Sequence, residues 1–377
     1  MTGSSLKHYA PLALFAAAVA LALPALGPLP QPAVHMAMTT PAPAPAAGGM
    51  ERRLLVNPAP SAHSASLADL GGGRVAAAWF AGSREGAADV NIVFASFDGQ
   101  AWSEARAIMT RAGVQRDTGR RVGKLGNPVL WRDGAGRLHL WFVSVGYGGW
   151  AASAINHSQS DDGGLSWSPA RRLLTSPFFN ISTLVRSSPL PLADGGVALP
   201  VYHEFIAKRP EWLRFDAAGQ IVDKQRLPGS AGLLQPSAAA FAANDIIALM
   251  RDASRKHRVH MASSADGGAH WTSAVATELA NPNASVALLR LADGRLLLAL
   301  NPDEHGRRQL ALQVSADRGQ SWSPPQLVES GAGGEDTGYS YPSLIQDDTG
   351  MIHLAYTWRR ETIAHLRFAP AALGAAR

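Results

Sequence analysis

The chain of 377 residues contains no cysteine, which excludes disulfide bonds and metal sites built from thiolates. Its 12 histidines show none of the spacings typical of zinc ligands, so no metal and no cofactor is predicted. Charged residues make up only 17% of the chain, and the net charge of +5 is spread thinly. Because no run of Lys and Arg is interleaved with aromatic residues, the sequence does not indicate a nucleic-acid groove. The small basic excess is compatible with an acidic substrate.

The N-terminus carries an apolar run, YAPLALFAAAVALAL, from Tyr9 to Leu23, preceded by Lys7 and His8. This pattern is typical of an export signal. The apolar character extends beyond the run, so an anchor in the inner membrane formed by residues 9–29 is the alternative to a cleaved signal peptide. In either case we expect the protein to be exported to the periplasm or the cell surface.

Changes in composition predict four segments along the chain. The stretch PAPAPAAGG, Pro41 to Gly49, is a Pro/Ala linker with too little apolar bulk to pack a core. The folded part is therefore expected to begin near Glu51. The predicted boundaries are 1–29 for the signal peptide or anchor, 30–50 for the linker, 51–369 for the folded domain and 370–377 for a C-terminal tail.

The octet S-x-D-x-G-x-x-W occurs three times, as SDDGGLSW, SADGGAHW and SADRGQSW. The aspartates of these boxes are Asp162, Asp266 and Asp317, of which the first two lie 104 residues apart and the last two 51 apart. A shorter copy, SFDGQAW, contains Asp98, and a degenerate copy, RFDAAGQIV, lies at Arg214–Val222. Periods of 20–50 residues or slightly more indicate repeat architectures such as propellers.

A second repeat runs out of phase with the first and pairs a tight turn with an alternating or apolar strand. It occurs six times, with the turn residues Asp69, Asp133, Asp194, Asp245, Asp293 and Asp348. Six units of about 53 residues therefore fill Glu51–Phe368. Short strands bounded by Gly and Asp turns favour an antiparallel meander, and six four-stranded units predict an all-β, six-bladed propeller.

Unit six lacks a fourth strand, and the stretch RRLLV, Arg52 to Val56, is the candidate to supply it and so close the ring. Each box is then the hairpin turn between the third and fourth strands of a unit. Its Asp accepts backbone N–H bonds, its Gly takes positive φ, and its Trp packs between blades. We interpret the boxes as structural and assign no chemistry to their aspartates.

The Asp/Gly turns between first and second strands and the boxes between third and fourth strands lie on one face of such a propeller. The loops between second and third strands and the connections between units lie on the other face. The residues that open the first strand of each unit converge on this second face: His63, Asn127, Ser188, Gln235, Asn283 and Tyr341. Its loops carry Arg84, Glu85, Asp89, Tyr147, His203, Glu204, Arg251, Asp252, Asp303, Glu304, Arg307, Arg308, Trp358, Arg359 and Arg360. Since arginine binds carboxylates bidentately, this face is predicted to bind an anionic sugar.

The box repeats on a six-bladed propeller resemble the sialidase (neuraminidase) superfamily over Glu51–Phe368. More closely, the chain resembles the bacterial sialidase-like BNR-repeat proteins called predicted neuraminidases. This likeness is carried by AAAWFAGSREGAADV, LPVYHEF, LLQPS, ALMR, NPNAS and GYSYPSLIQ. The resemblance implies an Asp acid/base, a Tyr nucleophile paired with a Glu, and three arginines that bind the carboxylate of the sugar.

The resemblance assigns the acid/base and the nucleophile residue by residue. Arg84 followed by Asp89 is similar to the family's R-x-x-x-x-D loop, which places Asp89 as the acid/base. Tyr341 in YSYPSL takes the nucleophile position, with Tyr339 as the alternative.

The second and third arginines of the family's triad are matched by Arg251 and Arg307, with Arg308 as the alternative to Arg307. The first arginine is missing, since His63 stands at its position. The glutamate that activates the tyrosine is also missing, since Gln235 stands sixteen residues before Arg251. A neutral Gln cannot accept the tyrosine proton, and a tyrosine with its ordinary pKa of about 10 is only about one part in a thousand ionised at pH 7.

Two substitutes for these missing groups are suggested by the sequence. The pair His203 and Glu204, on a neighbouring loop, is a candidate for the base. The basic insertion Thr110–Gly126 is either a mobile solvated loop or a source of the missing positive charge, through Arg116, Arg120 or Arg121.

The sequence thus predicts a sialidase-like glycoside hydrolase that acts on an acidic glycan, sialic-acid-containing or related. The first alternative is a lyase on a uronate-containing glycan, in which His63 and Tyr341 serve as base and acid. The second alternative is a propeller that binds carbohydrate without catalysis.

Overall fold

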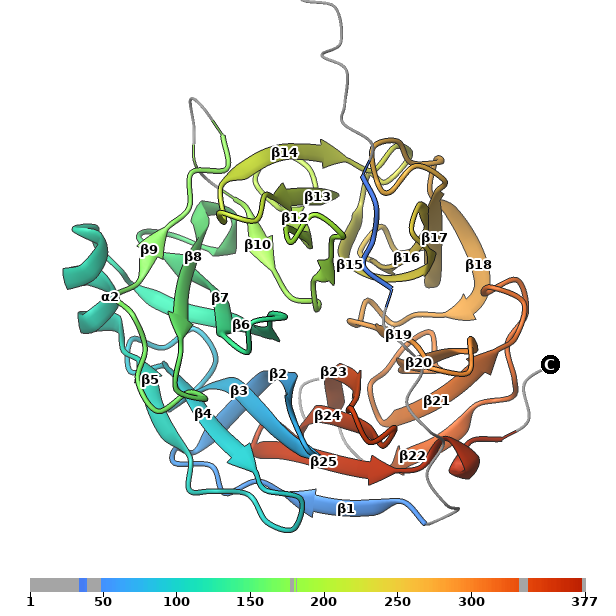
Figure 1. Cartoon of the computed structure of the whole chain (residues 1–377), viewed down its shortest axis with the longest axis horizontal. Coiled ribbons are helices and arrows are strands. Elements are labelled where there is room, and N and C mark those ends of the chain that lie inside the picture. The colour runs from blue at the N-terminus through green and yellow to red at the C-terminus, as the bar shows by residue number, and fades with distance from the viewer. Residues whose placement is uncertain (1–33, 39–48, 177–179, 181, 332–337, 375–377) are drawn as a thin grey trace, which may run out of the picture.

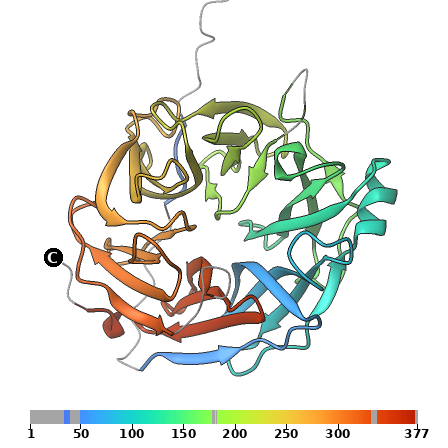
Figure 2. The same cartoon turned by 180° about the vertical axis from the view of Figure 1, so that it is seen from behind.

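A computed structural model of the chain describes residues 34–38, 49–176, 180, 182–331 and 338–374. Six antiparallel sheets are arranged around a central axis as the blades of a propeller (Figures 1 and 2). The predicted all-β, six-bladed propeller is confirmed.

Each blade is a meander whose first strand lies nearest the axis (Figure 1). Blades 1 to 3 consist of β2 (Ser61–Gly71), β3 (Arg74–Gly82), β4 (Asn91–Phe97) and β5 (Arg106–Met109); β6 (Lys124–Arg132), β7 (Leu138–Val145), β8 (Ser153–Ser160) and β9 (Arg171–Arg172); and β10 (Leu184–Val185), β11 (Leu190–Pro191), β12 (Val197–His203), β13 (Arg209–Phe215) and β14 (Ile221–Arg226). Blades 4 to 6 consist of β15 (Leu233–Ala242), β16 (Asp245–Asp252), β17 (Arg258–Ser264) and β18 (Val275–Ala280); β19 (Ala287–Arg290), β20 (Leu296–Leu300), β21 (Gln309–Ser315) and β22 (Gln326–Ser330); and β23 (Tyr339–Gln346), β24 (Ile352–Trp358), β25 (Thr362–Phe368) and β1 (Glu51–Leu54). Blade 3 has five strands because its inner strand is divided into β10 and β11, which both pair with β12.

The two ends of the propeller are joined in blade 6, where β1 pairs with β25 from Glu51↔Arg367 to Leu54↔Ala364. Side chains reinforce the joint, since Arg52 forms an ion pair of 2.8 Å with Glu329 of blade 5. The predicted closure of the ring by the stretch after Glu51 is confirmed. It also removes the unpaired edge that β25 would otherwise present.

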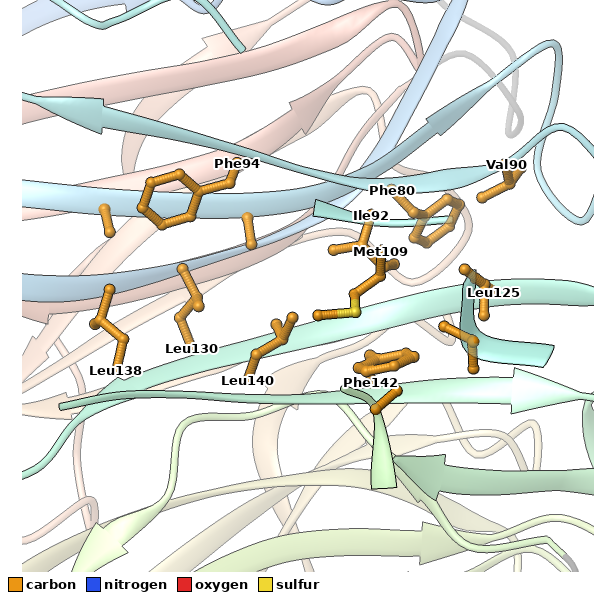
Figure 3. Close-up of a cluster of buried hydrophobic side chains, with 14 of the residues drawn as sticks. Phe80, Val90, Ile92, Phe94, Met109, Leu125, Leu130, Leu138, Leu140 and Phe142 are labelled. Atoms are coloured by element: carbon orange, nitrogen blue, oxygen red, sulfur yellow. The ribbon is translucent and has the colours of Figure 1, made fainter. Parts of the chain in front are cut away.

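The hydrophobic core is divided among six clusters, and each of them lies between two neighbouring blades. Figure 3 shows the cluster between blades 1 and 2, in which Phe80, Ile92 and Phe94 of one blade face Leu125 and Phe142 of the next. Each sheet is packed against a neighbouring sheet on both of its faces, so the strands are nearly continuous in apolar residues. Each blade is therefore held in place by its two neighbours.

The boxes are hairpin turns between the third and fourth strands, as predicted. In the box of blade 2, the Asp162 carboxylate accepts from the backbone N–H of Ser166 at 2.9 Å and from Oγ of Ser160 at 2.7 Å. Gly164 has φ of 92°, and its carbonyl accepts from Nε1 of Trp167 at 3.1 Å. Trp167 packs edge-on against Phe94 of blade 1. The box thus ties its own turn together and reaches the preceding blade.

Residues 34–38 are docked on the face that carries these turns, which we call the turn face. The N–H of Met36 donates to the carbonyl of Ala243, and the N–H of Ala193 donates to the carbonyl of His35. Val34 and Met36 are buried in the cluster between blades 3 and 4. The packed body therefore extends beyond the boundary expected near Glu51.

The apolar run at residues 9–29 lies outside the described residues, and none of the helices in the described part is long and apolar enough to cross a membrane. At the other end, the short helix η2 (Pro370–Ala372) packs on blade 5, where the carbonyl of Ala372 accepts from Nε2 of Gln326 at 3.1 Å.

Replacement of Asp162 with Ala tests the structural role of the box. The variant loses the acceptor of several turn hydrogen bonds, so we expect its melting temperature to fall by about 2–6 °C. Asp161→Ala is the matched control: Asp161 is adjacent but makes only an exposed ion pair with Arg137, so its loss should shift the melting temperature by less than about 1 °C.

Comparison of the wild type with Asp162→Ala also gives a pH test. The hydrogen bonds from Ser166 and Ser160 lower the pKa of Asp162 to about 2, below its value in an unfolded chain of about 3.9. Its stabilising effect is therefore present above pH 4 and is lost as the pH falls toward 2. The difference in melting temperature between the wild type and Asp162→Ala should narrow from pH 5 to pH 3. A difference that stays constant would contradict the role given to this carboxylate.

Candidate active site

The inner strands of four blades begin with the same β-bulge, on the face opposite the turn face. The register shifts there by one residue in each strand. The first residues of the bulges have φ between 44° and 58° and are Ser64, Asn127, Gln235 and Tyr341. A left-handed conformation costs a residue with a Cβ about 1–2 kcal/mol, and bulges re-aim the side chains they carry. The bulges turn polar side chains toward the axis, on what we call the site face.

A row of hydrogen bonds crosses the site face from blade 2 to blade 6. The hydroxyl of Tyr202 accepts from Nδ2 of Asn127 at 3.0 Å and from Nε2 of Gln235 at 3.2 Å. Nη1 of Arg251 then donates to Oε1 of Gln235 at 3.1 Å and to the hydroxyl of Tyr341 at 3.4 Å. Gln235 therefore reaches Tyr341 through Arg251 and makes no direct bond with it. Tyr202 was missed from the sequence, although it lies in the stretch LPVYHEF.

Tyr341 is surrounded by cations. Burial raises its pKa, but the charges of Arg251 and Arg307 outweigh that effect, and the pKa of Tyr341 lies below its ordinary value. The guanidinium of Arg186 lies 5.2 Å from the centroid of the tyrosine ring and donates to the Tyr341 carbonyl at 2.6 Å. The hydroxyl of Tyr341 is thus more easily ionised than that of an ordinary tyrosine.

Two of the predicted arginines are held by one residue. Nε of Arg251 donates to Oδ1 of Asn283 at 2.7 Å, and Nη2 of Arg307 donates to the Asn283 carbonyl at 2.8 Å. Burial and the charge of Arg251 lower the pKa of Arg307, because like charges lie close to it. Arg308, the alternative to Arg307, is exposed. A pair of adjacent guanidinium groups, fixed before any ligand binds, is suited to a carboxylate.

His63 does not replace the missing arginine. It is 2% exposed, packs edge-on against the ring of Tyr341 at 4.4 Å, and has its Nε2 3.8 Å from Oε2 of Glu85. Burial, followed by the charges of Arg360 and Arg307, holds its pKa well below the ordinary range, so the imidazole is neutral at pH 7.

The third positive charge comes instead from Arg360, which follows β24 in blade 6. Its Nη1 lies 3.5 Å from the same Glu85 carboxylate, and its charge acts on both His63 and Arg307. The sequence placed Arg360 on the site face but gave it no role. Its position in the loop after β24, on the face where the other arginines gather, is the signal that could have identified it.

Asp89, the predicted acid/base, lies at the exposed rim of its loop. It accepts from the backbone N–H and from Oγ of Ser83, both at 2.9 Å, and these bonds lower its pKa. Arg84 is also exposed. The residue of this loop that faces the centre is Glu85, which lies near His63, whereas Asp89 bonds to Ser83.

The predicted pair His203 and Glu204 is divided between the two sides of β12. His203 lies near Glu211 and Arg226, away from the site. Burial raises the pKa of Glu204, and the charges of Lys208 and Arg251 partly offset this rise. Ser188, expected to open an inner strand, lies between β10 and β11 and lines a cavity of about 730 Å³ around the axis on the turn face.

The basic insertion contains the helix α2 (Arg111–Thr118) at the outer rim of the propeller (Figure 1). Val114 anchors the helix in the core. Arg116 lies 3.9 Å from Asp117, and Arg121 stacks on the ring of Tyr147. The described contacts of these arginines do not include His63 or Tyr341, and the charge next to His63 comes from Arg360.

Among the described residues, no three His, Asp or Glu side chains are grouped so that they could hold a metal ion. The site offers the guanidinium groups of Arg251, Arg307 and Arg360, with that of Arg186 against the tyrosine ring. It also offers a tyrosine with a lowered pKa, a neutral imidazole and the carboxylate of Glu85. This set can bind an anion and can move a proton next to it.

The sequence matches the family described as BNR repeat-like domain over residues 73–354. Solved structures of similar shape include the Hadza microbial sialidase Hz136, with a TM-score of 0.71, 16% identity, and coverage of 84% of this chain and 67% of that chain. A protein of unknown function from Dyadobacter fermentans has a TM-score of 0.68 and 16% identity, covering 90% of this chain and 100% of that one. The intramolecular trans-sialidase of Ruminococcus gnavus has a TM-score of 0.68 and 15% identity, covering 86% and 98%. At these identities the likeness shows the fold, and no curated protein matches the sequence significantly.

The arrangement predicts that Tyr341 ionises at lower pH than an ordinary tyrosine. Arg251→Gln should raise the pKa of Tyr341, because it removes the largest source of stabilisation of the phenolate. The measurement is a pH titration by NMR with isotope-labelled tyrosine, assigned with Tyr341→Phe. Arg308→Gln serves as the control, since it removes an exposed guanidinium from the site face, in the loop that carries Arg307. Equal titration of Tyr341 in the wild type and in Arg251→Gln would show that the two side chains are not coupled.

Proposed function

The chain belongs to the BNR repeat-like family, and from that premise we propose that it is a sialidase-like glycoside hydrolase acting on an acidic glycan that carries sialic acid or a related sugar acid. The observation that carries the proposal is the position of the Tyr341 hydroxyl, bound by Arg251 within a cluster of guanidinium groups. The sialidases among the structures of similar fold support this class of substrate. Export, expected from the N-terminal run, is part of the same proposal.

In this proposal the sugar carboxylate binds to Arg251, Arg307 and Arg360. Each charged hydrogen bond contributes about 1.5–3 kcal/mol. Binding of the anion relieves the repulsion that lowers the pKa of Arg307. An anionic sugar therefore offsets the repulsion between the guanidinium groups, whereas a neutral sugar gains none of this binding energy.

Tyr341 then attacks the anomeric carbon, and the bond to the leaving oxygen breaks as the bond to the phenol oxygen forms. The proton of the phenol passes to the neighbouring pair of His63 and Glu85, which stands in for the absent glutamate at position 235. Water then hydrolyses the glycosyl-tyrosine. A tyrosine nucleophile is a known exception to the two-carboxylate pattern of glycosidases.

The leaving oxygen needs a proton, and Asp89 remains the candidate to give it. Its loop borders the site through Glu85. In the free protein the bonds from Ser83 favour the ionised form of Asp89, so Asp89 has to give up these bonds and take up a proton from solvent before it can protonate the leaving oxygen. This exchange is a step that the substrate itself would drive.

A second candidate, a lyase on a uronate, is favoured by one observation: the neutral imidazole of His63 packs against the ring of Tyr341 at 4.4 Å. In that reaction His63 removes the proton next to the carboxylate, the arginines stabilise the resulting anion, and Tyr341 protonates the leaving oxygen. Product analysis distinguishes the two, because hydrolysis releases a saturated sugar acid whereas elimination leaves a double bond that absorbs ultraviolet light. A propeller that only binds carbohydrate gives neither product.

Tyr341→Phe should lower the rate of aryl sialoside hydrolysis by at least about a hundredfold, because it removes the nucleophile. Affinity for the free sugar acid, measured by calorimetry, should change by less than about threefold. Tyr339→Phe is the control, since Tyr339 is buried in the core two residues away and should remain active. If Tyr341→Phe retains wild-type hydrolysis, Tyr341 is not the nucleophile.

Gln235→Glu separates the two enzymatic candidates by the sign of its effect. It places a carboxylate next to Nη1 of Arg251, one bond from the Tyr341 hydroxyl. A hydrolase should gain activity, on the order of tenfold, because the carboxylate can turn to accept the phenol proton once the sugar carboxylate engages Arg251, which separates the two side chains in the free protein. A lyase should lose binding and turnover, because the new charge lies beside the uronate.

Asn127→Asp is the matched control for that substitution. It introduces the same charge on the far side of Tyr202, without contact with Arg251. It should not raise hydrolysis. A gain in both variants would show that charge alone, and not a base near Tyr341, causes the effect.

A further inference from the structure

Blade 6 contains a row of hydrogen-bonded side chains that is sealed from solvent. The Asp347 carboxylate lies 3.0 Å from Nε2 of His353, and Nδ1 of His353 lies 2.9 Å from Nε2 of His365. Trp102 of blade 1 completes the row, since its Nε1–H donates to Nδ1 of His365 at 3.2 Å. Its indole meets the imidazole edge-on, with 5.1 Å between ring centroids. The side chains of Asp347 and His353 have no exposed surface.

Blade 2 repeats the first three members of this row. Nε2 of His139 lies 3.1 Å from Asp133, and Nδ1 of His139 lies 3.0 Å from Nε2 of His157. Here the row is open, with 17% of the His139 side chain and 22% of the Asp133 side chain exposed. The two blades thus hold the same arrangement, one covered and one uncovered.

The carboxylate determines which nitrogens carry protons. Asp133 accepts, so Nε2 of His139 donates to it, and Nδ1 of His139 accepts from Nε2 of His157. Burial lowers the pKa of His157 to about 3, so its ring is neutral at pH 7. Nδ1 of His157 is therefore an acceptor, and no described residue donates to it. The row in blade 6 obeys the same rule, because a donor, the indole N–H of Trp102, reaches its last nitrogen.

The tryptophan that covers blade 6 has no counterpart beside blade 2. Trp102 pairs with Phe97 across its hairpin, whereas the residue that pairs with Phe215 in the degenerate box of blade 3 is Ile221. A pocket of about 310 Å³ lies between blades 2 and 3, where a counterpart of Trp102 would stand if blade 2 were covered as blade 6 is. Its lining includes Trp131, His139, Trp141, His157, Arg171 and Phe215.

Trp141 shapes the pocket. It lies across the ladder from His157, where blade 6 has the small Ala355 across from His365. Its indole is stacked on His139, with an angle of 13° between the rings. The pocket therefore combines an aromatic wall with an unused acceptor nitrogen.

We propose that this pocket, between blades 2 and 3 on the turn face, binds a planar aromatic molecule of the indole class whose ring N–H donates to Nδ1 of His157. The contact of Trp102 with His365 is the example of that recognition within the chain itself. The volume is at the lower end of the range for small-molecule pockets, about 300–1,000 Å³, and suits a bicyclic ring. The pocket lies on the opposite face from Tyr341, so it is independent of the proposed function.

Titration of the full chain with indole, followed by calorimetry, tests the proposal. We expect saturable binding with Kd of about 0.1–1 mM, a reasonable value for so small a ligand. Benzothiophene has nearly the same shape but no N–H, and it should bind at least about fivefold more weakly because one hydrogen bond is lost. In NMR spectra of isotope-labelled histidine, the Nδ1 signal of His157 should shift on addition of indole.

Two variants locate the binding. His157→Phe removes the acceptor, and Ile221→Trp restores the ring that fills the equivalent place in blade 6. Both should weaken indole binding at least about fivefold and leave the titration of Tyr341 unchanged, which shows that the propeller is intact. If Ile221→Trp does not fold, His157→Phe decides alone. Absence of saturable binding, equal affinity for benzothiophene, or unchanged affinity in His157→Phe would overturn the proposal.

Discussion

The closure of the ring at blade 6 is the interaction on which the rest of the structure depends. There, strands from the two ends of the described chain pair, β1 with β25, and blade 6 then packs against blade 1. The contacts across the joint continue toward the axis, where the N–H of Ser64 donates to Oγ1 of Thr357 and the ring of His63 packs against Tyr341. The tyrosine and the histidine of the site therefore face each other only when the ring is closed, so formation of the site is linked to completion of the fold.

The charged side chains of the site stand at other positions than the resemblance to sialidases implies. Where the resemblance leads one to expect an arginine on blade 1, the chain has the neutral His63, and Arg360 on blade 6 supplies a cation. Where a glutamate is expected, Gln235 binds Arg251. Glu85 lies near both His63 and Arg360. Arg360 thus takes the place of the expected arginine, but it already lies 3.5 Å from the Glu85 carboxylate, so an incoming anion has to share Arg360 with Glu85.

Repeats made the fold predictable from the sequence, because each box and each turn specifies a local hairpin with hydrogen bonds of its own, as at Asp162. The arginines at 251 and 307 and the tyrosine at 341 were also predictable, since strand ends place them on one face. The direction of loop side chains was not. Asp89 folds back on Ser83 while its neighbour Glu85 faces inward, and His203 and Glu204 alternate across a strand. Such choices depend on contacts with other blades that local spacing does not encode.

The docked segment from Val34 to Met38 gives the propeller a direction. It is fixed on the turn face by backbone bonds to blades 3 and 4, and the chain enters the body at that place (Figure 1). The arginines and Tyr341 lie at the other end of the axis. An attachment ahead of Val34 would therefore hold the propeller by its turn face, with the guanidinium groups of the site face directed away from the attachment.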